Sequence, residues 1–163
     1  MIEIAGSPNE LVRPRTEPVD DARGDAATLQ VNQPSCLAVL RAEWSTLALV
    51  STEAGASGKA FARALVETAR SYRLRPVKDL SAAEPASAQV PQLADALAAA
   101  RGGDSRAVMV VDDPVANPAD APLVLAADAV LLLVRLGTTD LRSVEQIAEL
   151  AGRERVIGCV IVG

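Results

Sequence analysis

The sequence predicts a three-layer α/β domain built on a mainly parallel sheet of about five strands. Short, uninterrupted apolar segments, such as residues 107–111 and 129–134, alternate with segments of helical periodicity. Strands that are apolar along their whole length are typical of parallel sheets covered by helices on both faces. Half of the 163 residues are hydrophobic but only 2% are aromatic, so we expect an aliphatic core of Ala, Val and Leu.

The expected elements follow one another in a regular order. Strands are predicted at residues 47–51, 74–80, 107–111, 129–134 and 156–162. The second of these is a weak edge strand, because Pro76 interrupts it. Helices are predicted at residues 35–44, 59–72, 93–100, 122–127 and 140–151. Capping residues support these limits, since Gly102-Gly103 ends the third helix, Thr139 or Asp140 caps the last one, and Gly152 ends it.

Residue spacing identifies the side chains expected in the core. The inward face of the helix at 59–72 carries Phe61, Leu65, Ala69 and Tyr72. The inward face of the last helix carries Leu141, Val144, Ile147 or Ala148, and Ala151. Trp44, Met109 and Cys159 precede or lie within apolar strands, and we interpret all three as packing residues.

Residues 1–34 differ from the rest of the chain in composition. Six acidic residues and three arginines give this segment a net charge of −3, out of −5 for the whole chain. Prolines punctuate it at positions 8, 14, 18 and 34, and no apolar period develops. We therefore predict an acidic N-terminal arm, flexible or docked on a partner, followed by one domain over residues 35–163.

Composition and charge exclude several classes of function. The chain has no histidine, which removes His-based triads, general bases and metal sites, and two cysteines cannot form a thiolate-rich metal site. A net charge of −5 argues against direct nucleic-acid binding, because neutralising phosphates needs an excess of Lys and Arg. No segment has the roughly 18–20 apolar residues that cross a bilayer, nor the features of a secretory signal. We expect a cytoplasmic protein without membrane insertion.

The loop after the strand at 47–51 is the first candidate site. A phosphate-binding loop needs glycines that turn N–H groups toward the phosphate, a lysine that neutralises it, and a Ser or Thr that holds Mg²⁺. The candidate phosphate contacts are Gly55, Ser57, Gly58 and Lys59. Glu53 replaces the first glycine of the usual pattern, and Ala60 replaces the hydroxyl residue. The alternative interpretation is an ordinary glycine-containing turn with an exposed lysine.

The second candidate lies at the end of the strand at 107–111. Asp112 follows this strand directly, at the edge where an open α/β sheet places its ligand chemistry. In phosphate-loop enzymes an Asp in this position holds Mg²⁺, so Asp112 is a candidate metal ligand. The alternative interpretation is a strand-ending turn formed by Asp112-Asp113-Pro114.

Together these pieces resemble a known family, the bacterial tyrosine autokinases of capsule and exopolysaccharide synthesis. These kinases belong to the same class of phosphate-loop ATPases as the chromosome-partitioning and septum-positioning ATPases. The resemblance covers residues 35–163 and rests mainly on VVDDPV at 110–115, Asp120, ADAVLLLVR at 127–135 and IGCVIVG at 157–163. It implies a phosphate-loop NTPase-like fold and a setting in polysaccharide assembly.

The sequence also departs from that family. Only Gly58 and Lys59 match the kinases' loop, and the second acidic motif that the family uses for Mg²⁺ has Asp79 as its nearest, poor candidate. The kinases' tyrosine-rich segment has no counterpart in these 163 residues, whose single tyrosine is Tyr72. We therefore assign no catalytic residue and expect any binding of ATP and Mg²⁺ to be weak.

The resemblance and the departures together imply a non-catalytic or weakly nucleotide-binding regulatory protein of bacterial exopolysaccharide biosynthesis or export. The implied partner is a membrane polysaccharide copolymerase, a chain-length protein or a related kinase, which recruits this protein to the inner face of the membrane. Two alternatives remain open. One is an active ATPase or protein tyrosine kinase that uses Lys59, Asp112 and Asp79; the other is a positioning protein similar to the chromosome-partitioning ATPases.

Overall fold

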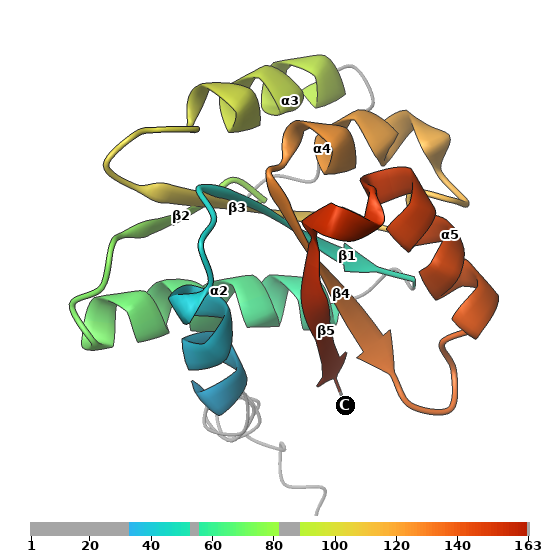
Figure 1. Ribbon diagram of the computed structural model, residues 1–163, viewed down its shortest axis with the longest axis horizontal. Coiled ribbons are helices and arrows are strands. Elements are labelled where there is room, and N and C mark those ends of the chain that lie inside the picture. Colours follow the sequence, from blue (N-terminus) through green and yellow to red (C-terminus); the bar gives the residue numbers. More distant parts are fainter. Residues whose placement is uncertain (1–32, 53–55, 82–88, 163) are drawn as a thin grey trace, which may run out of the picture.

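The computed structural model describes residues 33–52, 56–81 and 89–162 and confirms the predicted α/β architecture. One five-stranded sheet has the strand order β2-β3-β1-β4-β5, and every neighbouring pair of strands is parallel (Figure 1). The strands are β1 (Thr46–Ser51), β2 (Val77–Asp79), β3 (Arg106–Asp112), β4 (Ala129–Arg135) and β5 (Val156–Val162). The predicted edge strand is therefore at the edge, shortened to three residues.

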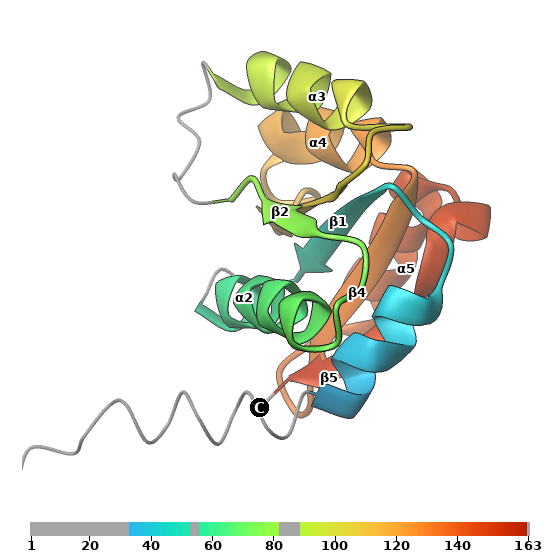
Figure 2. The ribbon, with the colours of Figure 1, turned by 90° about the vertical axis from the view of Figure 1, so that its left-hand side faces the viewer.

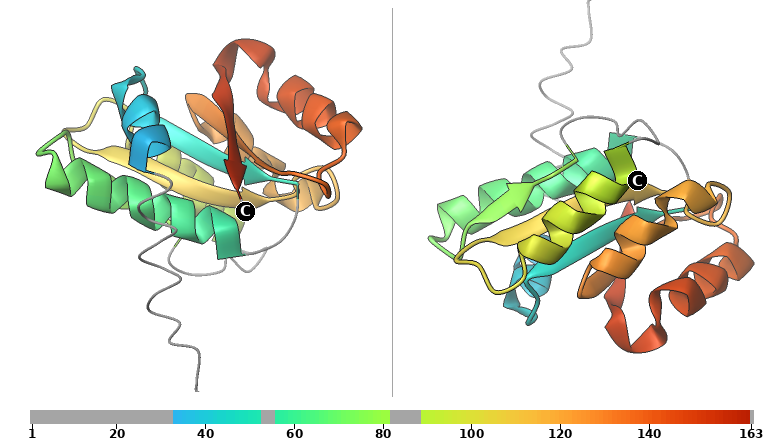
Figure 3. Two further views of the ribbon diagram at one scale, coloured as in Figure 1. Left: turned by 90° about the horizontal axis from the view of Figure 1, so that it is seen from below. Right: turned by 90° about the horizontal axis from the view of Figure 1, so that it is seen from above.

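Helices cover both faces of this sheet. They are a helix at residues 33–41, α2 (Ala56–Ser71), α3 (Val90–Ala99), α4 (Ala121–Ala126) and α5 (Leu141–Ala151). Short 3-10 helices span Pro118–Asp120 and Arg153–Arg155. Figure 2 shows the sheet between α2 on one side and α3 and α4 on the other, and Figure 3 shows both helix layers from below and above. No helix in the described ranges is long and apolar enough to cross a membrane.

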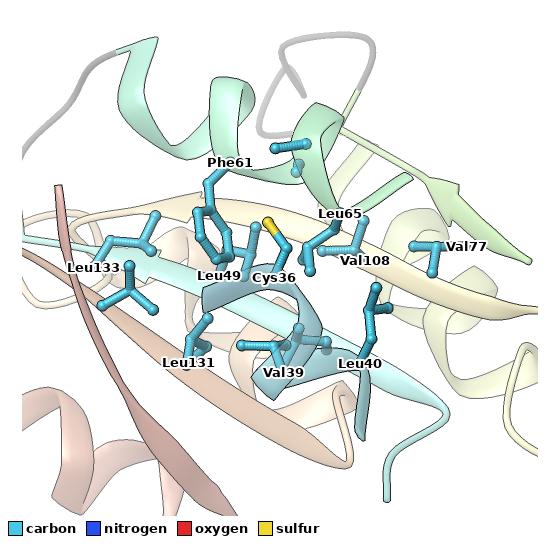
Figure 4. Packing of buried hydrophobic residues seen from close by; sticks show 14 of the residues in the cluster. Cys36, Val39, Leu40, Leu49, Phe61, Leu65, Val77, Val108, Leu131 and Leu133 are labelled. Atoms are coloured by element: carbon cyan, nitrogen blue, oxygen red, sulfur yellow. The ribbon is translucent and has the colours of Figure 1, made fainter. Parts of the chain in front are cut away.

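The central strand β1 explains why the core has two halves. All six of its residues are buried, and successive side chains point to opposite faces of the sheet. Leu47 and Leu49 join one cluster with Phe61 and Leu65 of α2. Figure 4 shows Leu49 beneath Phe61 and Leu65. Ala48 and Val50 join the second cluster, under α3, α4 and α5. Continuous apolar strands thus reflect burial on both faces, as the sequence predicts.

Three residues expected in the core lie at the surface. Tyr72 is 50% exposed because α2 ends at Ser71, so Tyr72 falls beyond the helix face that packs on the sheet. Leu141 is 75% exposed at the first position of α5. Cys159 is exposed because β5 is an edge strand, whose residues are not buried on both faces as those of β1 are.

Asp128 holds together the amino-terminal ends of β1 and β4. Its carboxylate accepts hydrogen bonds from the Ser45 N–H, at 3.0 and 3.2 Å for its two oxygens, and from the Thr46 N–H at 3.0 Å. The Asp128 N–H in turn donates to the Thr46 hydroxyl at 2.9 Å. Asp128 belongs to one of the segments that carry the family resemblance. In this structure it has a structural role at the amino-terminal ends of the strands, whereas the candidate site lies at their carboxyl ends.

Candidate functional site

The candidate site lies at the carboxyl edge of the sheet, where β1, β3 and β4 end and α2 begins. Open parallel sheets bind ligands at this edge, because the loops that follow the strands converge there. The α2 helix starts at Ala56, three residues before the predicted start, so Ser57, Gly58 and Lys59 form its first turn. Gly55 and Glu53, on which part of the predicted loop rests, lie outside the described residues.

Gly58 sets how closely α2 approaches the sheet. A Cβ atom at this position would lie 2.6 Å from the Cγ1 atom of Val110 in β3, which is closer than real Cβ atoms come to another atom. Only glycine therefore lets the first turn of α2 rest on the end of β3. Gly58 thus has a packing reason to be glycine beside any role in binding phosphate.

Two of the predicted site residues line one small pocket. Lys59 of α2 and Asp112 at the end of β3 both line a pocket with a volume of about 120 Å³. The other lining residues include Ser81, Val110, Asp120 and Leu123. One carboxylate oxygen of Asp112 is buried. The Lys59 cation and the amino terminus of α2 favour a phosphate group at this pocket, whereas the carboxylates of Asp112 and Asp120 favour a cation there.

Asp112 and its neighbour Asp113 divide the two roles that the sequence left open. Asp113 forms the turn: its N–H donates to the Ser51 carbonyl at 2.7 Å, and its carboxylate accepts from the Ala116 N–H at 3.0 Å. Its backbone has φ +35°, a conformation that few residues other than glycine adopt. Asp112, one residue earlier, lines the pocket.

Ser57 lies beside a second cation, Arg135, which the site predictions did not include. The Arg135 guanidinium donates to the Ser57 hydroxyl at 3.1 Å, although the two residues are 78 positions apart. The Arg135 N–H donates to the Thr139 hydroxyl at 2.9 Å, and Thr52 donates to the same hydroxyl at 3.3 Å. Asp140, and not Thr139, caps α5, by accepting from the Arg142 N–H. Thr139 instead ties the loop after β4 to the end of β1.

Ser81 is a pocket residue that the sequence did not reveal. Its hydroxyl accepts a hydrogen bond from the Val110 N–H at 2.7 Å, and so continues the pairing of β2 with β3 after the short strand ends. Asp79 does not line the pocket; its carboxylate accepts from the Ser81 N–H at 2.8 Å. No signal in the sequence other than proximity to a predicted strand end identifies Ser81.

Two described groups away from this pocket have shifted pKa values. Burial raises the pKa of the Cys36 thiol to about 11, where Cys36 packs between the helix at 33–41 and α2. Burial also lowers the pKa of Arg106, whose guanidinium lies 4.5 Å from the centre of the Trp44 ring. Within the described ranges, no three Asp, Glu or Cys residues cluster in a way that could hold a metal ion. The assignment of Asp112 to Mg²⁺ therefore remains a prediction.

The chain was also compared with known proteins. No protein-family model matches it, and no curated protein matches it.

Proposed function

We propose that this protein binds the phosphate groups of a nucleotide weakly at the α2 amino terminus and does not hydrolyse them. The observation that carries this proposal is the shared pocket of Lys59 and Asp112 at the carboxyl edge of a parallel sheet. Lys59 supplies positive charge, and the first turn of α2 offers backbone N–H groups that have no partner within the helix. Both favour an anion at the same point.

The size of the pocket supports a terminal phosphate as the buried part of the ligand. About 120 Å³ suits a phosphate-sized group, whereas pockets that enclose a whole small molecule span roughly 300–1,000 Å³. The base and sugar of a nucleotide would then lie largely outside the pocket. Affinity is expected to be low, because most of the ligand surface stays in water.

Ala60 supports the absence of turnover. Phosphoryl transfer depends on a metal ion that neutralises charge on the reacting phosphate, and in phosphate-loop enzymes a Ser or Thr hydroxyl holds this ion. Ala60 follows Lys59 directly and offers no oxygen ligand from its side chain. The proposed role is therefore that of a sensor or adaptor whose state depends on a bound nucleotide.

We further propose that this role belongs to bacterial exopolysaccharide synthesis or export. The support is the resemblance of residues 110–115, 127–135 and 157–163 to the tyrosine autokinases of that process. A membrane copolymerase, a chain-length protein or a full-length kinase fits as the partner. Recruitment by such a partner would bring the protein to the inner face of the membrane.

Isothermal titration with ATP and Mg²⁺ tests the binding part of the proposal. We expect weak binding that Lys59→Ala lowers about tenfold, the contribution of one charge-assisted hydrogen bond. Lys78→Ala is the matched control, because Lys78 is the only other lysine and is exposed on β2, outside the pocket. Phosphate release by the unaltered protein should equal that of Lys59→Ala.

Two results would contradict the proposal. Equal loss of affinity in both lysine variants, or no detectable binding, would mean that the α2 amino terminus is only a packed turn. Magnesium-dependent ATP turnover that Lys59→Ala abolishes would favour the active ATPase or kinase instead.

A further inference from the structure

A groove lies at the far end of α2 from the candidate site. It has a volume of about 430 Å³ and is lined by apolar side chains that include Val66, Leu74 and Val77, together with Arg70 and Arg73. Leu74 is 41% exposed, and its neighbour Tyr72 is 50% exposed. This end of α2 therefore presents an apolar surface beside two cations.

The surroundings of this groove are strongly basic in a protein of net charge −5. Between residues 66 and 78 the chain has four Lys and Arg residues and one acidic residue, Glu67. Glu67 pairs with Arg70 at 3.5 Å on the exposed surface. Of the carboxylates in the described ranges, none comes within ion-pair distance of Arg63, Arg73 or Lys78. The groove thus offers uncompensated positive charge next to apolar side chains.

The acidic N-terminal segment has the complementary chemistry and is attached close by. Residues 17–25 (EPVDDARGD) contain four acidic residues and one arginine, with Val19 among them. The described chain begins at Gln33, whose side-chain amide donates a hydrogen bond to the Tyr72 hydroxyl at 3.3 Å. The segment is therefore tethered at the same end of α2 as the groove.

We propose that residues 17–25 of this chain dock in the groove between α2 and β2, with their carboxylates toward Arg70 and Arg73. The tether is long enough, because the eight residues from 25 to 33 reach up to about 26 Å when extended. The groove itself follows α2 from residue 66 to the helix end at Ser71, about 7.5 Å along the helix axis, and continues along residues 73–77. A short tether also gives the segment a millimolar effective concentration, which favours it over a second copy of the chain.

Docking leaves the candidate phosphate site open. Lys59 and Val66 are separated by about 10 Å along the axis of α2, and Arg73 lies beyond the far end of this helix at Ser71. The segment would instead cover apolar surface at Leu74 and pair with Arg73, which has no acidic partner within the described ranges, whereas Arg70 already has Glu67 beside it.

Paramagnetic relaxation in the full-length chain tests this proposal. A nitroxide is attached at Ala22→Cys in a Cys159→Ser background, since Cys36 is fully buried and has a raised pKa. We expect strong broadening of the backbone amide signals of Val66 and Leu74, and none for those of α5. A sample that mixes spin-labelled chains with ¹⁵N-labelled chains separates docking within one chain from docking between chains.

Charge variants separate docking from mere tethering. Asp20→Asn/Asp21→Asn removes two charges from the proposed contact, and Glu3→Gln/Glu10→Gln removes two charges elsewhere in the same arm. One exposed ion pair changes an equilibrium by roughly 1.4- to 5-fold, so the first variant should lower the docked-to-free ratio about 2- to 30-fold. The second variant should leave it unchanged. Equal broadening in both variants, no broadening at all, or broadening that survives only in the mixed sample would each overturn the proposal.

Discussion

Removal of the Asp128 carboxylate is expected to destabilise the fold without touching the candidate site. This side chain is the acceptor for the N–H groups of Ser45 and Thr46, and it joins the starts of β1 and β4. Hydrogen bonds to a charged group contribute about 1.5–3 kcal/mol each, and partial exposure lets water replace part of that contribution. We therefore expect Asp128→Ala to lower the free energy of unfolding by about 2–3 kcal/mol, and Asp128→Asn, which keeps one acceptor oxygen, by about 1–2 kcal/mol.

Urea unfolding followed by tryptophan fluorescence measures this effect directly. Trp44 is the only tryptophan, is buried and precedes Ser45, so its emission reports on the strand ends that Asp128 joins. Asp95→Asn is the matched control, because Asp95 is exposed on α3, and it should change stability by no more than about 0.5 kcal/mol. If Asp128→Ala unfolded at the same urea concentration as the control, the carboxylate would contribute nothing to holding the strands together, and the reasoning would fail.

Three further predictions follow from packing and burial. Gly58→Ala should lower the free energy of unfolding by about 1–3 kcal/mol in the same urea assay, because the new alanine Cβ meets the Val110 side chain. In a Val110→Ala background, Gly58→Ala should no longer lower the free energy of unfolding. In native protein, a thiol reagent should label Cys159 rapidly and Cys36 only after unfolding; equal rates would contradict their different burial. Since burial raises the pKa of Cys36 to about 11, its contribution to stability is complete below the pKa of the unfolded thiol and is lost as pH rises toward 11. Urea titrations between pH 8 and about 11 should show this loss in the unaltered protein and not in Cys36→Ala.

The sheet was predictable because its strands are apolar along their whole length. The observed β1, β3 and β4 differ from the predicted strands by at most one residue at each end, since burial on both faces leaves a continuous signal in the sequence. Strand order was not predictable in this way. It depends on pairings between distant segments, and for that reason the sequence did not identify β5 as an edge strand or Cys159 as exposed.

The candidate site was predictable only in part, for a related reason. Lys59 and Asp112 each follow a recognisable local signal, and the rule that ligands gather at the carboxyl edge of parallel strands brings them together. Arg135 and Ser81 enter the site through hydrogen bonds to residues 78 and 29 positions away. No local pattern encodes such contacts, because they depend on which loops meet after the sheet has formed.

Ala60 connects the resemblance to the proposed loss of catalysis. Mg²⁺ requires nearly ideal octahedral oxygen coordination. The hydroxyl that Ala60 lacks therefore weakens the Mg²⁺ site, but restoring this one ligand does not complete the coordination. Asp79, the candidate second acidic residue, uses its carboxylate to accept from the Ser81 N–H and does not line the pocket. Ala60→Thr is therefore expected to raise the affinity for ATP and Mg²⁺ by only about threefold, the contribution of one weak hydrogen bond, without measurable phosphate release. Sustained turnover in Ala60→Thr that a further Lys59→Ala change abolishes would mean instead that a single hydroxyl separates this chain from an active ATPase.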